Sequence, residues 1–162
     1  MLVSFKSLPN FSRIWIFQSS RVFTNIELVE IKLKLDFFLN QWAAHGVKLE
    51  TGHLTPYNRF IVIGLNESNQ FATGCSIDSC VKFIKELELE YNIDLLDKMN
   101  VTFRIGETID YVSLKEFRSL AKRRKVSLKT IVFNNLVLDK EQFEDLWEVP
   151  AVNSWHSHFM KI

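Results

Sequence analysis

The sequence predicts an α/β (α+β) protein with a ferredoxin-like β-α-β-β-α-β core, an antiparallel sheet and additional C-terminal helices. Two observations carry this prediction. Patterns typical of strands and helices follow one another in that order between residues 12 and 105. The segments 12–18 and 59–65 are apolar on both faces, as the two inner strands of such a sheet would be. The other two predicted strands, 47–51 and 101–105, are apolar on one face only, which is typical of edge strands.

The length and composition favour one soluble domain. With 162 residues the chain can form one ordinary hydrophobic core, so we expect a single domain over 1–162, with the core at 12–105 and a helical extension at 113–162. The net charge of +1 gives no overall field that would attract nucleic acid or an anionic membrane. No apolar run has the length of a signal peptide or a transmembrane helix. Cys75 and Cys80, five positions apart on one predicted helix, point away from each other, so we expect free thiols and a cytoplasmic location.

The first half of the predicted core contains three strands and one helix. Segment 12–18 is rich in β-branched and aromatic residues and is too short for a helix. Thr24 and Glu27 have the spacing of a capping box, which predicts the start of a helix. His45-Gly46 is the predicted stop of this helix. Its apolar residues recur at helical spacing: Leu28, Ile31, Leu35, Leu39, Trp42. Period-two alternation predicts the strand at 47–51, and 59–65 is predicted to be central in the sheet.

The rest of the chain, from the second predicted helix to the C-terminus, begins with Ser76 as the predicted cap of that helix. The strand at 101–105 completes the predicted sheet, and a second capping box at 113–116 begins a helix that ends in the basic run 122–125. Segment 128–137 fits either a strand or a helix, and we favour the helix. A short helix from Asp139 to Trp147 and an irregular tail from Pro150 follow. We expect this last third, or a second subunit in a homodimer, to cover the outer face of the sheet.

The glycines exclude the common nucleotide-binding loops. With glycine only at positions 46, 52, 64, 74 and 106, neither GxxxxGK[ST] nor GxGxxG can be written. We therefore expect no ATPase activity and no cofactor.

The predicted start of the helix near residue 75 is the main candidate site. Gly74, Ser76 and Asp78 surround free amides and the positive end of a helix dipole, which favour an anionic ligand. Tyr57 and Arg59, polar residues beside an apolar strand, are candidates for lining the same kind of pocket. The ordinary explanation of these residues is turn formation and helix capping.

A thiol-dependent enzyme is the second hypothesis. The same helix end would favour the thiolate of Cys75, the nucleophilic form of cysteine. Catalysis also needs a base, for which His156 is the candidate, although His45, His53 and His158 are alternatives that the sequence does not separate. The ordinary explanation of Cys75 is a small buried residue in the turn that enters the helix.

Two further patterns suggest a metal and a nucleic acid. His156 and His158 would project to one face of an extended tail and could supply two metal ligands, but no other residues have a diagnostic spacing.

Residues 121–131 resemble a helix-turn-helix, and the basic segment Arg118–Lys129 could neutralise phosphates. Lys125 occupies the usual turn-glycine position, and a solvated helix end accounts for the cations. We expect neither a metal nor a nucleic-acid partner.

Six segments spread over nearly the whole chain resemble a family of short, uncharacterised bacterial proteins: RIWIFQSSRVFT, YNRFIVIGLN, ATGCSIDSCVKFI, YNIDLLDKMNVTF, TIVFNNLV and WEVPAVNSWHSHF. Some members bear the name "ABC transporter ATPase", which the missing phosphate loop argues against. The resemblance implies a bacterial cytosolic protein and transfers no site residue. We expect a module that binds a small anion or another protein, with the thiol enzyme and nucleic-acid binding as alternatives.

Overall fold

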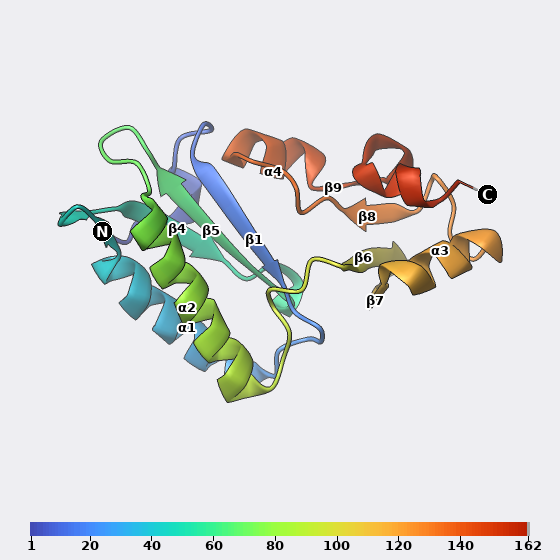
Figure 1. Ribbon diagram of the computed structural model, residues 1–162, viewed down its shortest axis with the longest axis horizontal. Helices are drawn as coiled ribbons and strands as arrows, with labels where there is room; N and C mark the ends of the chain where they lie inside the picture. Colours follow the sequence, from blue (N-terminus) through green and yellow to red (C-terminus); the bar gives the residue numbers. More distant parts are fainter. Residues whose placement is uncertain (162) are drawn as a thin grey trace. The chain divides into compact units, whose positions relative to one another are not determined.

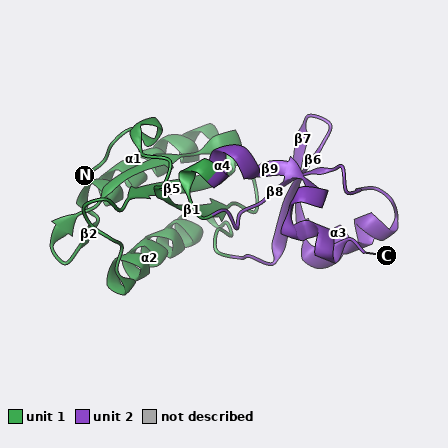
Figure 2. Ribbon diagram, turned by 90° about the horizontal axis from the view of Figure 1, so that it is seen from above, with its two compact units in different colours: residues 1–96, 138–141 green, residues 97–137, 142–162 purple. Residues whose placement is uncertain are grey.

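The computed structural model describes residues 1–161, which form two compact units (Figure 2). Unit 1 comprises Met1–Leu96 with Leu138–Glu141, and unit 2 comprises Asp97–Val137 and the chain from Gln142 onward. We expected one domain with a core at 12–105, but the boundary falls after Leu96 and places 101–105 in unit 2. The described residues form a mixed α/β structure with four α-helices and antiparallel sheets. None of these helices combines the length and the apolar character needed to cross a membrane.

The sheet of unit 1 has three antiparallel strands in the order β1-β5-β4. They are β1 (Arg13–Gln18), β4 (Glu50–Leu54) and β5 (Phe60–Asn66). The central position of β5 confirms the prediction for 59–65, because a strand that is apolar on both faces must be covered on both. The prediction that 12–18 is also an inner strand is wrong, because β1 is an edge strand of this sheet. The edge of β1 that faces away from β5 has only an isolated bridge, from Arg13 to Asp139.

Helices α1 (Asn25–Gln41) and α2 (Gly74–Tyr91) cover one face of the unit 1 sheet side by side (Figure 1). The capping box of α1 is confirmed: the Glu27 amide donates to Thr24 Oγ1 at 3.2 Å, and the Thr24 amide donates to Glu27 Oε1 at 2.8 Å. The predicted N-cap of the second helix is wrong by three residues. Thr73 is the cap, and Ser76 closes the box from inside the first turn.

The stop predicted at His45-Gly46 is a hairpin turn instead. Helix α1 ends at Gln41, and the short strands β2 (Ala43–Ala44) and β3 (Val47–Lys48) pair around the turn. His45 and Gly46 have φ values of 51° and 76°, the left-handed geometry that a two-residue hairpin turn requires. The prediction of a left-handed Gly46 is therefore confirmed, but the element that it forms is a hairpin turn and not a helix end.

The N-terminal segment lies on the other face of the unit 1 sheet. It contains the short 3-10 helix η1 (Phe5–Ser7). A Cβ atom on Gly64 of β5 would lie 2.7 Å from Leu8 Cδ1 and 3.0 Å from Phe5 Cε2, so these two side chains pack directly against the main chain of the strand. We expected the C-terminal third or a second subunit to cover this face, and residues 5–8 take part of that role.

Unit 2 contains a separate antiparallel sheet in the order β7-β6-β8-β9. Its strands are β6 (Asn100–Ile105), β7 (Thr108–Ser113), β8 (Ile131–Phe133) and β9 (Glu148–Pro150). Helix α3 (Leu114–Lys122) begins at the predicted cap Ser113 and packs against this sheet, with Phe103 and Phe117 in contact at 5.3 Å between ring centroids. The remaining elements are α4 (Lys140–Leu146) and the 3-10 helices η2 (Pro56–Asn58), η3 (Ala151–Asn153) and η4 (Trp155–Phe159).

The pairing of β6 corrects the expected topology. The ferredoxin-like arrangement needs β6 beside the strands of unit 1, but β6 pairs with β7 on one edge and β8 on the other. Both edges of its hydrogen-bonding ladder are therefore used within unit 2. The strand β7 was not predicted, and segment 128–137, for which we favoured a helix, contains the strand β8. The expected helical extension is thus a unit of sheet and helices.

Candidate functional site

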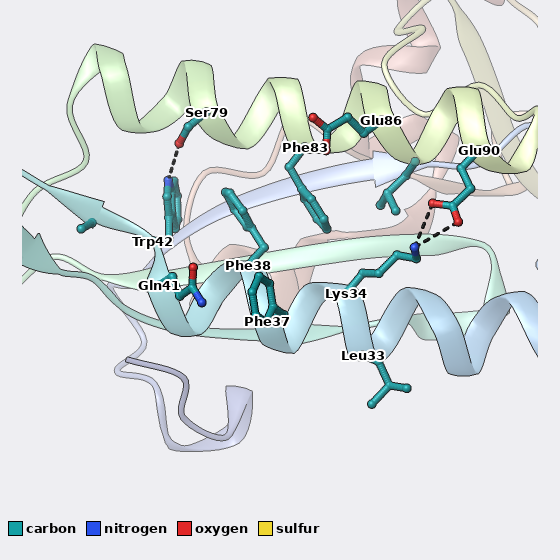
Figure 3. A pocket seen from close by; sticks show the side chains of 12 residues that line it. Leu33, Lys34, Phe37, Phe38, Gln41, Trp42, Ser79, Phe83, Glu86 and Glu90 are labelled. Carbon is teal, nitrogen blue, oxygen red and sulfur yellow. Dashed lines mark hydrogen bonds and ion pairs between the residues drawn. The ribbon is translucent and has the colours of Figure 1, made fainter.

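A groove of about 740 Å³ runs between α1 and α2 (Figure 3). This volume is within the range of about 300–1,000 Å³ that is typical of ligand pockets. The buried side chain of Leu87 lies at its floor, and aromatic side chains form its walls. Charged and polar side chains stand at the rim: Lys34, Gln41, Glu86, Glu90.

Aromatic contacts between the helices shape the wall of the groove. The rings of Phe38 on α1 and Phe83 on α2 are stacked in parallel with centroids 4.5 Å apart. Phe38 also contacts Trp42, at 5.8 Å between centroids. The indole Nε1 of Trp42 donates to the Ser76 carbonyl at 2.8 Å and to Ser79 Oγ at 3.2 Å, so its polar group is satisfied inside the wall. The groove is a built feature of the helix pair, because the same contacts hold the two helices together.

The rim of the groove is acidic toward the C-terminal end of α2. Lys34 pairs with Glu90 at 2.9 Å, and both side chains are partly exposed, so this pair adds little stability. Glu86 has no ion pair in the described structure, so its charge is not compensated. Tyr91 donates its hydroxyl to Glu30 Oε2 at 3.1 Å. Burial, followed by this bond to Glu30, raises the pKa of the Tyr91 phenol, which keeps the hydroxyl protonated as a donor.

A row of exposed apolar side chains continues the groove along the outer side of α1. We call Ile26, Val29, Leu33 and Phe37 the α1 stripe; their spacings of three, four and four residues place them on one side of the helix. They are 76%, 60%, 64% and 69% exposed, respectively. Because Leu33 and Phe37 also line the groove, stripe and groove form one continuous surface.

The stripe was visible in the sequence but was not singled out. The apolar residues that predict the helix are those that face the core, and Ile31, Leu35 and Leu39 among them are fully buried. The second set has the same periodicity, shifted around the helix. A helix that is apolar on two sides needs two partners, and unit 1 provides only one of them.

Cys75 lies where the sequence predicted, in the first turn of α2, and its side chain is exposed. The two histidines of unit 1 are placed elsewhere: His45 lies in the β2–β3 turn, and His53 of β4 lies 2.6 Å from Asp36 Oδ1. In residues 1–161, Cys75 makes no hydrogen bond to a histidine. Cys80 is buried, and burial raises the pKa of its thiol to about 12, so it stays protonated.

The polar groups at the start of α2 are largely occupied by the helix cap. The Thr73 amide donates to Ser76 Oγ at 2.7 Å, and the Ser76 hydroxyl donates to the Thr73 carbonyl at 2.9 Å. The buried Ser76 is thus a capping residue, while Gly74 and Asp78 are exposed. The groove includes none of the predicted ligand-binding residues: Gly74, Ser76, Asp78, Tyr57, Arg59.

Tyr57 and Arg59 lie at the entry to β5. Tyr57 and its neighbour Asn58 have left-handed φ values of 56° and 52°, and Arg59 is buried. The Arg59 carbonyl accepts a hydrogen bond from the Ser19 amide at 2.8 Å, which fixes the entry to the strand. The main chain of these residues thus shapes the start of β5.

His156 and His158 do not share a face, since the tail is the 3-10 helix η4 and is not extended as we assumed. His156 is buried within unit 2, with Nδ1 2.7 Å from Ser154 Oγ and its ring stacked on Trp155. Burial lowers the pKa of His156 to about 4, so its imidazole is neutral near pH 7. In the described part of the chain, no group of three His, Cys, Asp or Glu side chains is placed to hold a metal ion.

The helix-turn-helix interpretation of 121–131 is wrong. After α3 the chain passes through Arg124 in a left-handed conformation (φ 58°), and the next regular element is the strand β8. A recognition helix therefore does not follow α3. The basic segment Arg118–Lys129 ends the helix, and Arg123 forms an ion pair with Glu116 at 2.9 Å.

Comparison with known proteins finds no matching family model, no similar curated protein and no similar solved structure.

Proposed function

We propose that this protein is an interaction module that binds an amphipathic helix of a partner through the α1 stripe and the adjoining groove. The observation that carries the proposal is the α1 stripe itself, in which four large apolar side chains are at least 60% exposed along one side of one helix. Single exposed apolar residues are normal on protein surfaces, whereas a continuous patch is typical of an interaction site.

The shape of the surface supports a helical partner. The stripe extends over three turns of α1, and the groove beside it offers a hollow for the side chains of a second helix. An amphipathic helix in a groove presents its anchors at the same three- and four-residue spacing. Burial of each stripe side chain would contribute about 1–2 kcal/mol, given that each is partly covered already.

The charge of the rim supports a partner with basic flanks. Among the described residues Glu86 has no ion pair, and Lys34, which lines the groove, is paired with Glu90. Lysine or arginine beside the apolar face of the partner would meet these carboxylates and favour the correct orientation.

The other hypotheses have less support. An anion at Gly74–Asp78 would compete with a cap that already uses the Ser76 hydroxyl and amide. A thiol enzyme lacks a base among the histidines of unit 1 that bonds Cys75. Both cysteines are free, which supports a reducing compartment such as the cytoplasm.

The test uses two synthetic fluorescent peptides with identical leucine faces, one with lysine and one with glutamate on the polar face. In anisotropy titrations we expect saturable, micromolar binding of the Leu/Lys peptide, and binding of the Leu/Glu peptide at least about tenfold weaker. Phe37→Asp should abolish binding. Leu89→Asp is the matched control, because Leu89 is 85% exposed on α2 and lies outside the groove.

Both substitutions are at exposed positions and should leave the melting temperature nearly unchanged. An absence of binding by the Leu/Lys peptide, or an equal loss with Phe37→Asp and Leu89→Asp, would refute the proposed surface.

A further inference from the structure

We infer that the helix that binds the α1 stripe is α1 of a second copy of this chain. The two helices would pack antiparallel, with a two-fold axis that crosses α1 at the level of residues 31 and 32. This inference rests on the proposed function and names the partner. It places the homodimer on the helical face of unit 1, whereas the sequence suggested the outer face of the sheet, where Phe5 and Leu8 lie.

The stripe is nearly symmetric about its own centre. Ile26 and Phe37 are equally distant from the point between Ile31 and Lys32, and Val29 and Leu33 are equally distant from Ile31. A two-fold contact places each residue opposite its mirror position on the other helix. An antiparallel pair of α1 helices therefore brings Ile26 against the partner's Phe37 and Val29 against the partner's Leu33.

The charges beside the stripe have the same symmetry. Glu30 and Lys34 are equally distant from Lys32, and both lie on the flank of α1 that faces α2, since Glu30 accepts from Tyr91 and Lys34 pairs with Glu90. In an antiparallel helix pair, one flank faces the same flank of the other helix. Glu30 thus lies opposite the partner's Lys34. By the two-fold symmetry, Lys34 lies opposite the partner's Glu30.

The existing contacts of these two residues are compatible with that pairing. Tyr91 binds Glu30 through Oε2, and Oε1 of Glu30 is not used in a hydrogen bond to described residues. Lys34 remains 39% exposed in its pair with Glu90 and can donate to a second carboxylate. The charge match with a second copy thus rests on Glu30 and Lys34, and among the described residues of α1 Lys34 is also the one cation on this flank of the second copy that could meet the acidic rim of the groove.

The size of the surface predicts a weak dimer. An interface of one helix and a groove edge on each subunit belongs to the small class of specific interfaces, below about 1,200 Å² in total. We expect a monomer–dimer equilibrium with a micromolar dissociation constant.

Sedimentation equilibrium of the full chain from submicromolar to high micromolar concentration tests the inference. Glu30→Lys and Lys34→Glu should each weaken the dimer about tenfold, because each creates two like-charge contacts. An equimolar mixture of these two variants should dimerise as well as the original chain, since the heterodimer restores both opposite-charge pairs. Glu90→Gln is the control: it breaks the Lys34–Glu90 pair without changing the sign of the charges at the axis.

The outcomes separate the two proposals. A chain that stays monomeric but binds the Leu/Lys peptide through Phe37 refutes the second copy and leaves the interaction surface intact. A dimer that Phe37→Asp does not weaken, or variants that fail to complement each other in the mixture, overturns the antiparallel α1 contact. Failure of both dimerisation and peptide binding removes both proposals.

Discussion

The indole Nε1 of Trp42 donates a hydrogen bond of 2.8 Å to the main-chain carbonyl of Ser76 and thereby joins the C-cap of α1 to the first turn of α2. Ser76 is also the residue that closes the capping box with Thr73. One aromatic side chain thus connects the end of one helix, the start of the other and the wall of the groove between them.

Trp42→Phe should destabilise unit 1 by about 2–3 kcal/mol, from the lost hydrogen bond and the smaller ring. The measurement is urea unfolding. Trp15→Phe is the control, because Trp15 packs against Trp42 at 5.7 Å between ring centroids but is half-buried, and its indole makes no hydrogen bond to residues 1–161. Equal losses for the two variants would show that the bond to Ser76 contributes nothing.

Lys140→Met should loosen the N-terminal segment. The buried Lys140 donates through Nζ to the carbonyls of Lys6 at 2.9 Å and Leu8 at 2.7 Å. Methionine keeps the apolar stem but removes this donor from two carbonyls, which should lower the free energy of unfolding by about 2–4 kcal/mol. Chemical denaturation and faster amide exchange at Leu8 measure the effect. Lys6→Met, at an exposed side chain, should change stability by less than about 0.5 kcal/mol.

His156 should make stability depend on pH between about 4 and 6.5. Burial lowers its pKa from 6.5 to about 4 in the folded chain, so the unfolded chain binds more protons across this range. The free energy of unfolding is therefore highest above pH 6.5 and falls as the pH decreases, by about 3 kcal/mol at pH 4. Denaturation at pH 7 and pH 4.5 should show this loss, and His156→Gln should reduce it. An unchanged pH dependence in this variant would contradict the assignment.

Glu27 contributes to acid stability in a different range. Its hydrogen bonds from Arg21 and from the Thr24 amide lower its carboxyl pKa to about 2. A lowered carboxyl pKa stabilises the folded chain above the unfolded value of 4.5, and this contribution is lost only as the pH falls from 4.5 toward 2. The two titrations are therefore separable in one pH series.

Native alkylation with iodoacetamide should modify Cys75 and spare Cys80. Cys75 is exposed, whereas Cys80 is buried with its thiol pKa raised to about 12. Mass spectrometry should show one adduct in buffer and two in urea, and Cys75→Ser should remove the native adduct. Two native adducts would show that the α2 helix opens readily.

Some features of this fold could be predicted because they are local. The capping box of Thr24 and Glu27 needs only three residues of helix to form, and both of its bonds are present. The central position of 60–66 follows from apolar side chains on both faces of one strand. The free cysteines follow from their positions around a single helix.

The α1 stripe could not be predicted from the sequence, because it depends on which side of α1 the rest of the chain leaves uncovered. The periodicity of Ile26, Val29, Leu33 and Phe37 resembles that of the buried set on the same helix, and no sequence pattern states which set faces the core. The predicted site at Cys75 lies at the correct helix end, but the cap that occupies its polar groups is Thr73, whereas the sequence pattern predicts Ser76.

The sequence by itself determined where the four α-helices and the strands β1, β5 and β6 form, because helix caps, turns and apolar periodicity involve residues that are near each other in the chain. Only the tertiary structure decided the strand partners. The main-chain NH and CO groups of β6 could pair with any neighbouring strand. In the structure β6 pairs with β7 and β8 of unit 2 and does not join the β1-β5-β4 sheet. Tertiary packing likewise decided which side of α1 is covered and which remains exposed, since burial depends on the area that neighbouring elements can cover.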